Sequence, residues 1–329
     1  MTIAPHPSPS ADRTSPKASA DTLTVLSRRT LTSDIVELTL GRPEGGRLPD
    51  WTPGSHIDLI LPSGSVRQYS LCGDRMDPLS YRIAVLRTPD GRGGSAEAHT
   101  LTPGTAVRFG GPRNNFRLGP ASSYRFIAGG IGITPLLPMI RQAAELEADW
   151  RLLYLGRRSS ALAYLPELAP HGDRVQVHCS HDAGRQDIAA WLGEMPDDCL
   201  VYACGPNPLL DDAEALRDRF SGPRIRTERF TGRAQSQSID SSPYDITLAQ
   251  SGRVIRAEAD QTIGEALRAG GTEVVMSCGQ GVCGTCELSV LRGEPDHRDS
   301  ILDEQERDEG ACVYPCVSRS LSKTLVLDL

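Results

Sequence analysis

The chain has 329 residues, of which 39% are hydrophobic and 23% charged, and its formal net charge is -7. At about 150 residues per domain this length predicts two or three domains, and the negative charge excludes a general basic surface for nucleic acid. No apolar run approaches the roughly 18 residues needed to cross a bilayer, so no membrane association is expected.

Nine cysteines make an odd number, and the C-terminal fifth of the chain is rich in them. Nothing at the N-terminus has the apolar core of a secretory signal. In a reducing compartment this spacing favours metal or redox chemistry over disulfides. We therefore predict a cytoplasmic protein.

The first 20 residues are rich in Pro, Ser and Ala and predict a disordered tail. From Thr22 to about Leu118, short strands alternate with Gly and Pro turns. This pattern predicts a small antiparallel barrel. The expected strands cover residues 35–40, 56–61, 67–71, 81–86 and 106–109.

Two pieces of this barrel suit a flavin. Arg67 fits a phosphate, and Tyr69 and Ser70 on the same strand fit the ring and its polar edge. The Gly93-Gly94-Ser95 turn, at a predicted helix start, offers backbone amides to phosphate oxygens. Either piece alone is more typical of an ordinary surface strand or turn, but their order ahead of a nucleotide motif favours the flavin.

In residues 124–229 the pattern changes to strands that alternate with helices, which predicts a parallel α/β sheet. The expected strands cover residues 124–128, 151–155, 174–179 and 200–203, and the expected helices 135–146 and 188–192. The composition of residues 231–243 is typical of a linker, and we expect one there. A second, α+β unit follows, with strands at 245–249 and 254–257 and a helix at 263–269.

A glycine turn joins the first strand of the α/β unit to its helix. Gly130 and Gly132 lie in this turn, Thr134 is a candidate helix cap, and Pro135 suits the first helical position. Backbone amides and the helix dipole at such a turn favour pyrophosphate. The turn lacks the G-x-G-x-x-G pattern, so it predicts nucleotide binding only together with the motif at Cys204, Gly205 and Pro206, which ends a later strand.

The C-terminal unit holds the most specific motif. Cys278, Cys283 and Cys286 are separated by four and two residues, and Cys316 follows at a distance. This is the spacing of a plant-type [2Fe-2S] cluster, which needs four thiolates. A zinc site is the alternative, although zinc ligands more often come as two short pairs. Cys312 competes for the fourth position, but Cys316 has the better spacing.

With all three motif sets in this order, the chain resembles the phthalate dioxygenase reductase family within the ferredoxin-NADP reductase-like superfamily. The resemblance covers about Thr22 to Leu329 and implies an antiparallel β-barrel flavin domain, a parallel-sheet nucleotide domain and a β-grasp ferredoxin domain. The expected boundaries are 1–20 for the tail, 21–119 for the barrel, 120–230 for the nucleotide domain, 231–243 for the linker and 244–329 for the ferredoxin domain.

The resemblance also implies the cofactors and their contacts. It implies FMN, although the residues alone do not separate FMN from FAD, and NADH, although Arg157 and Arg158 leave NADPH open. It implies that the nicotinamide lies beside Cys204, Gly205 and Pro206, and that the flavin ring lies against Phe230. The remaining contacts implied for the flavin are Ala84, Val85 and Leu86.

A hydride brings two electrons, whereas a [2Fe-2S] cluster accepts one at a time, so a flavin is needed between NADH and the cluster. The resemblance implies a reductase whose partner is a terminal oxygenase, either a Rieske-type aromatic dioxygenase or an O-demethylase. We expect a monomer. A haem-thiolate monooxygenase is the alternative partner. An iron-sulfur redox sensor without turnover is the alternative from another class.

Overall fold

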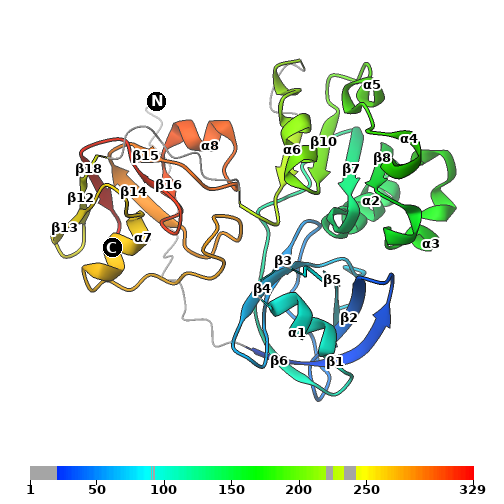
Figure 1. Cartoon of the computed structure of the whole chain (residues 1–329), viewed down its shortest axis with the longest axis horizontal. Helices are drawn as coiled ribbons and strands as arrows, with labels where there is room; N and C mark the ends of the chain where they lie inside the picture. Colours follow the sequence, from blue (N-terminus) through cyan, green and yellow to red (C-terminus); the bar gives the residue numbers. More distant parts are fainter. Residues whose placement is uncertain (1–20, 90, 92, 220–224, 233–241) are drawn as a thin grey trace, which may run out of the picture.

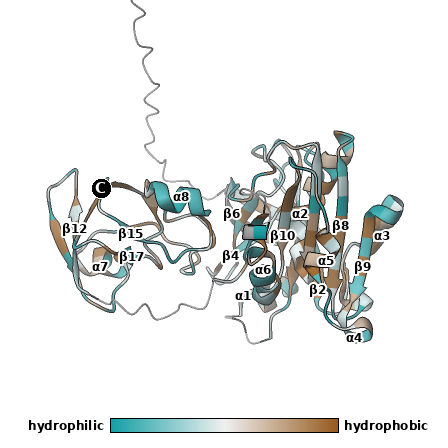
Figure 2. Cartoon of the chain, turned by 90° about the horizontal axis from the view of Figure 1, so that it is seen from above, coloured by the Kyte–Doolittle hydropathy of each residue, from teal (hydrophilic) through white to brown (hydrophobic). Residues whose placement is uncertain are grey.

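The computed structural model describes residues 21–89, 91, 93–219, 225–232 and 242–329. The predicted tail at 1–20 and most of the predicted linker at 231–243 lie outside these residues. The described chain forms three units, each built around its own sheet (Figure 1). Figure 2 shows the C-terminal unit to one side of the other two, which lie together. Within the described residues, no helix has the length and apolar character to span a membrane.

The first unit is the predicted antiparallel barrel, with strand order β4-β3-β6-β1-β2-β5. Strands β4 and β5 lie at the two edges, and just beyond β4 the Cys72 amide donates to the Arg82 carbonyl on β5 at 2.9 Å. This bond brings the edges together. The elements are β1 (Asp21–Thr30), β2 (Ile35–Gly41), β3 (His56–Ile60), β4 (Val66–Ser70), β5 (Ser80–Leu86), α1 (Gly94–Thr100) and β6 (Ala106–Arg113).

The second unit is the predicted parallel sheet, with strand order β11-β10-β7-β8-β9. Strand β7 is buried along its whole length because both faces of the sheet are covered. Phe126 packs in the same apolar cluster as residues of α2, and Ile127 in the cluster that holds residues of α5 and α6. The strands are β7 (Ser123–Gly129), β8 (Asp149–Gly156), β9 (Val175–Cys179), β10 (Leu200–Cys204) and β11 (Ile225–Glu228).

The helices of this unit are α2 (Ile133–Glu145), α3 (Leu165–Leu168), α4 (Ser180–Ala183), α5 (Ile188–Leu192) and α6 (Asn207–Glu214), with 3-10 turns η1 (Gly130–Gly132), η2 (Ser159–Ala161), η3 (Ala169–Arg174) and η4 (Arg217–Arg219). The start predicted for α2 was wrong by two residues. Gly132 is the N-cap, and the Thr134 hydroxyl donates to the Ile131 carbonyl at 3.0 Å instead of capping the helix. The 3-10 turn η1 leads directly into the helix, so Pro135 is its third residue.

The third unit has a mixed sheet of order β13-β12-β18-β14-β16 and a two-stranded sheet of β15 and β17. Helix α7 begins with a capping box between Thr262 and Glu265. The elements are β12 (Tyr244–Leu248), β13 (Val254–Ala257), α7 (Ile263–Ala269), β14 (Leu288–Arg292), β15 (Pro295–Asp296), α8 (Glu304–Glu309), β16 (Cys312–Val313), β17 (Arg319–Ser320) and β18 (Thr324–Leu327). Strand β12 pairs in parallel with the distant β18.

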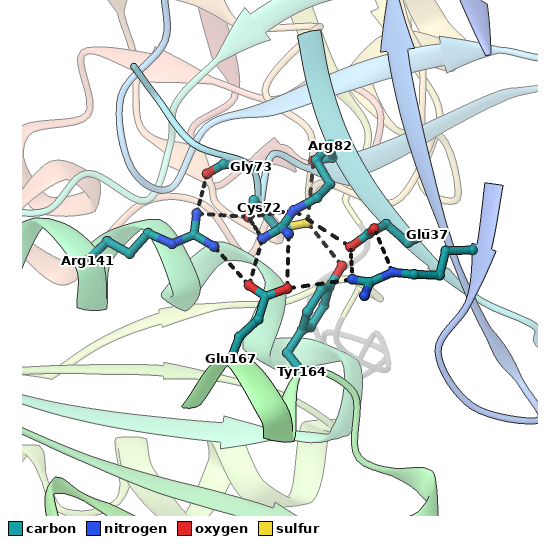
Figure 3. A network of polar contacts seen from close by, with 8 residues as sticks. Glu37, Cys72, Gly73, Arg82, Arg141, Tyr164 and Glu167 are labelled. Carbon is teal, nitrogen blue, oxygen red and sulfur yellow. Dashed lines mark hydrogen bonds and ion pairs between the residues drawn. The ribbon is translucent and has the colours of Figure 1, made fainter. Parts of the chain in front are cut away.

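A polar network joins the barrel to the α/β unit (Figure 3). Glu167 of α3 accepts two hydrogen bonds from Arg82 of β5, each 3.0 Å long, and one of 3.0 Å from Arg141 of α2. Burial opposes ionisation, but these guanidinium groups lower the pKa of Glu167. Ala84 and Cys72 of the barrel also belong to the apolar core around α2. The two units therefore share a partly apolar, partly ionic interface.

Candidate functional site

The four cysteines predicted as cluster ligands lie together. The Cys278, Cys283 and Cys286 side chains come from the loop after α7 and are buried, and Cys316 comes from the segment after β16. The Cys278 thiol is within hydrogen-bonding reach of the thiols of Cys283 and Cys316, and the Cys316 thiol also reaches Cys286. Two distant parts of the chain thus place four sulfur atoms in one group.

Backbone amides are directed at these sulfur atoms, which is the arrangement that anionic thiolates require. The Gln280 amide donates to Cys278 Sγ at 3.3 Å. The Thr285 amide is directed at Cys283 and the Gly281 amide at Cys316, and both lower the pKa of the thiol that they meet. Gly281 has φ +65°, and a Cβ there would lie 2.6 Å from Val317, so only glycine fits this turn. The loop therefore fits a thiolate-bound cluster.

Cys312 differs from these four. It lies in β16. Its pKa is raised to about 11, first by burial and then by the nearby carboxylates of Glu287, Asp299 and Glu306. No other thiol is among them, so its surroundings favour Cys316 as the fourth ligand. Within the described parts of the chain, no group of three or more His, Cys, Asp or Glu side chains is arranged to hold a single metal ion.

Arg67 and the N-terminus of α1 converge on one side of the barrel. A Cβ on Gly94 would collide with the Arg67 guanidinium, so this side chain lies directly over the first turn of the helix. Gly93 has φ +80°, and Ser95 accepts a hydrogen bond of 3.1 Å from the Thr88 amide. A cation beside free helix amides is the chemistry that a phosphate needs. The fold therefore brings together four of the predicted flavin residues, namely Arg67, Gly93, Gly94 and Ser95.

The other predicted flavin contacts lie on strands β4 and β5. Burial raises the pKa of Tyr69 to about 12, so its phenol stays protonated at neutral pH, and Ser70 is buried at the end of β4. Along β5, Val85 points into the barrel core, whereas Ala84 packs with the core around α2 and Leu86 is 38% exposed. Because side chains alternate between the two faces of a strand, Val85 lies on the opposite face of β5 from Ala84 and Leu86.

The two motifs predicted for the nicotinamide face each other. A Cβ on Gly132 would collide with the Cys204 carbonyl oxygen, and one on Gly129 would lie 2.7 Å from the Pro206 ring. The Gly130 carbonyl accepts a hydrogen bond of 3.1 Å from the Tyr154 hydroxyl, which holds the glycine turn. Both motifs follow the carboxyl ends of parallel strands, where ligands bind in sheets of this kind.

Glu228 was not among the residues predicted from the sequence. It ends β11 beside Cys204 in the parallel ladder, and its Oε2 atom is buried and has no hydrogen-bond partner among the described residues. Burial raises the pKa of Glu228 to about 8, and burial and this carboxyl raise that of Cys204. The signal in the sequence was its place at the end of the last parallel strand, next to the strand that carries the motif at 204–206.

Phe230 follows Glu228 and is held away from the core. The Arg229 side chain is 1% exposed and forms ion pairs of 2.7 Å with Asp211 and 3.0 Å with Glu214, whereas Phe230 is 40% exposed. Just beyond, a Cβ on Gly232 would lie 2.6 Å from the Gln280 carbonyl oxygen in the cysteine loop. The end of the α/β unit therefore lies against the loop that carries the cluster ligands.

Arg157 and Arg158 follow β8 and are exposed. The Arg158 guanidinium lies 3.2 Å from the ring nitrogen Nε2 of His181.

Comparisons with known proteins agree with this geometry. Residues 246–320 match the family model of the 2Fe-2S iron-sulfur cluster binding domain. The chain is 41% identical to the phenoxybenzoate dioxygenase subunit beta of Ectopseudomonas oleovorans over 90% of this chain and 93% of that protein. It is 37% identical to the vanillate O-demethylase oxidoreductase of Pseudomonas sp. strain HR199 over 92% of this chain and 97% of that protein.

Two solved structures are also similar. Phthalate dioxygenase reductase, described as a modular structure for electron transfer from pyridine nucleotides to [2Fe-2S], matches with a TM-score of 0.68 and 34% identity over 94% of this chain and 98% of that one. An intact type IV self-sufficient cytochrome P450 monooxygenase matches with a TM-score of 0.88 and 37% identity over 94% of this chain. The match spans only 41% of that longer protein.

Proposed function

Because the chain belongs to the phthalate dioxygenase reductase family, we propose that it is the NADH-dependent reductase component of a two-component oxygenase system. It is an oxidoreductase whose cofactors are FMN, a [2Fe-2S] cluster and NADH. Bound flavin and cluster would supply acceptance of a hydride from NADH and release of its two electrons one at a time. The observation that carries the proposal is that the cysteine loop lies against both other units: Gly232 at the end of the α/β unit packs on Gln280, and Gln68 of the barrel donates to Ser277 Oγ at 2.8 Å.

We assign the cluster to Cys278, Cys283, Cys286 and Cys316. The directed amides of the loop stabilise negative charge on their sulfur atoms. The Cys283 thiol donates to Thr285 Oγ1 at 3.2 Å, and a thiolate at Cys283 would instead accept a hydrogen bond from this hydroxyl. These donors favour a negatively charged centre within a buried loop.

For FMN we assign Arg67 and the α1 amides at residues 93–95 to the phosphate, and Tyr69, Ser70, Phe230 and the strand residues 84–86 to the ring. The alternation along β5 suggests that Ala84 and Leu86 offer side chains and Val85 only its backbone. The exposed Phe230, anchored by Arg229, suits an aromatic cover that gives way to the nicotinamide. No acid or base is assigned, because hydride transfer depends on positioning.

For the nicotinamide we assign the facing turns, namely Gly130, Gly132 and Thr134 on one side and Cys204, Gly205 and Pro206 on the other. Gly132 packs against the Cys204 carbonyl and Gly205 against Gly129, so these two positions have no room for a side chain and expose backbone to the coenzyme. We also propose the domain boundaries 21–119, 120–230 and 244–329, which agree with the three sheets.

The partner that we propose is a Rieske-type aromatic dioxygenase or O-demethylase, which is what the names of the full-length relatives suggest. A haem-thiolate monooxygenase is the second candidate, because a P450 monooxygenase contains a similar unit within its longer chain. We further propose a monomer that works in the cytoplasm, where reducing conditions keep its nine cysteines available.

The test begins with protein loaded with FMN and cluster and titrated anaerobically with NADH and, separately, with NADPH. We expect NADH to bleach the flavin absorbance and to produce the electron paramagnetic resonance signal of a reduced [2Fe-2S] cluster. Protein that retains neither group, or that NADH does not reduce, would overturn the proposal. Purified Rieske oxygenases and P450 enzymes, compared as acceptors with substrate present, then decide between the two partners.

A further inference from the structure

The cysteine loop makes direct contacts with the flavin barrel. The His56 ring of β3 lies with Nε2 3.3 Å from the carbonyl oxygen of Cys283, and Gln68 of β4 donates to Ser277 Oγ at 2.8 Å. A Cβ on Gly284 would lie 2.6 Å from the Asn115 amide nitrogen, so this side chain packs on the loop backbone. Three barrel residues thus touch the loop on both sides of Cys283.

The contacts of His56 and Gln68 come from one face of the hairpin formed by β3 and β4. His56 is the ladder partner of Ser70, and Asp58 is the partner of Gln68. Residues two apart on a strand share a face, so these four lie on the same side of the hairpin. Ser70 ends the strand that also carries Arg67 and Tyr69. The contact to Cys283 therefore starts one strand away from the assigned flavin residues.

We propose that His56 is a positioning residue that holds the cluster-binding loop, through the Cys283 backbone, at a fixed place on the flavin barrel. This inference rests on the proposed function, because it takes Cys283 as a cluster ligand and β4 as part of the flavin site. None of the contacts described above joins His56 to the residues assigned to the flavin phosphate or to the two nicotinamide turns.

The chemistry of the contact determines its direction. A backbone carbonyl only accepts hydrogen bonds, so Nε2 of His56 carries the proton and donates to Cys283. His56 is 5% exposed, so water cannot readily replace the bond when it is lost. The bond acts on the backbone of a residue whose sulfur atom is an assigned ligand, and it therefore bears on the position of the cluster itself.

The residues around His56 hold this face of the hairpin rigid. Asp58 accepts a 2.7 Å hydrogen bond from Gln68 and forms a 2.7 Å ion pair with Arg113, which is the ladder partner of His56 on β6. Gln68 thus uses its amide group both for Asp58 and for Ser277. A side chain fixed at one end loses less freedom when it binds a second group, so the face is preorganised to receive the loop.

The test compares His56→Leu with His56→Gln in protein loaded with both cofactors. Leucine fills a similar volume without a donor, whereas the glutamine amide can place an N–H near the position of Nε2. Hydrogen exchange of the amides in residues 277–286 is the first measurement, since it reports the loop and not turnover. We expect exchange roughly tenfold faster in His56→Leu, because a buried hydrogen bond is lost, and near-normal exchange in His56→Gln.

Anaerobic stopped-flow measurements give the second readout. We expect NADH to reduce the flavin at the normal rate in both variants, whereas the later reduction of the cluster is slower by roughly tenfold or more in His56→Leu only, since small displacements at a site have large effects on rate. The paramagnetic spectrum of the chemically reduced cluster should stay unchanged, which shows that the ligands are intact. Normal loop exchange and normal cluster reduction in His56→Leu would overturn the inference.

Two further measurements separate the possible failures. If His56→Leu does not fold or loses a cofactor, His56→Asn replaces it, because its amide is polar but too short to reach Cys283, and unchanged exchange there overturns the inference equally. If the wild-type protein is not reduced by NADH, the proposed function fails. If the wild type is reduced normally and the variants match it in both readouts, only the role of His56 fails.

Discussion

Substitution of Gly132 by alanine should separate the two turns that we assign to the nicotinamide. The added methyl group would collide with the Cys204 carbonyl oxygen and would lie 2.8 Å from the Gly205 nitrogen. These are backbone atoms, which cannot rotate out of the way as a side chain does. The glycine turn and the 204–206 motif would therefore have to move apart.

The cost follows from the rigidity of the site. Inserting a methyl group into a well-packed place costs about 1–3 kcal/mol. Since about 1.4 kcal/mol is tenfold in an equilibrium constant, we expect the NADH concentration needed for half-maximal flavin reduction to rise by roughly tenfold. The free energy of unfolding should fall by about 1–3 kcal/mol in the same variant.

Gly130→Ala is the matched control for stability. Gly130 has φ +55°, but a Cβ there would meet no atom within 4 Å. Its substitution should therefore cost only the left-handed strain of about 1 kcal/mol. Urea unfolding and anaerobic flavin reduction at a series of NADH concentrations measure both variants. A Gly132→Ala protein with unchanged NADH dependence, or one no less stable than Gly130→Ala, would refute the packing argument.

Three other substitutions test the cluster, the interface and the buried carboxyl. Cys283→Ser removes a cluster ligand and should abolish cytochrome c reduction while NADH still bleaches FMN; undiminished cytochrome c reduction would contradict the order of the carriers. Glu167→Gln leaves Arg82 and Arg141 without their shared carboxylate, and because the site is partly exposed we expect only about 1–2 kcal/mol lower stability in urea unfolding, with a smaller loss in high salt. An equal loss at all salt concentrations would mean that packing and not charge is responsible. Burial raises the pKa of Glu228 in the folded state from its ordinary value of 4.5 to about 8. Between these two pH values the folded state holds a proton that the unfolded state has released. The free energy of unfolding therefore falls as the pH rises from 4.5 to 8. Glu228→Gln should therefore be more stable than the wild type at pH 8, by at most about 5 kcal/mol, and similar to it near pH 4.5; a difference that does not change with pH would show that the carboxyl is not buried as described.

Features written in short stretches of sequence were predictable. Strands β2 to β6 of the barrel, the parallel sheet and helix α7 follow from hydrophobic periodicity and turn residues, and the iron-sulfur domain follows from the cysteine spacing. The start of α2 was predicted two residues too late. Thr134 and Pro135 are a plausible cap and first residue by local rules, but the 3-10 turn at 130–132 continues directly into the helix.

Strands β14, β16 and β18 and helix α8 were not predicted. Strand β16 has only two residues, too few for a period of two to be visible, and β18 lies in parallel beside β12, almost eighty residues earlier in the chain. Pairing at this distance has no local signature.

Spacing along the chain was thus enough to predict the iron-sulfur domain and to propose its ligands, because a tight loop needs its cysteines and glycines at fixed intervals. Folding decided which of those residues meet. The contact between His56 and Cys283 joins residues 227 positions apart, and the burial of Glu228 beside Cys204 depends on two strands aligned in one sheet. Such contacts arise from the packing of whole units, so no local pattern in the sequence contains them.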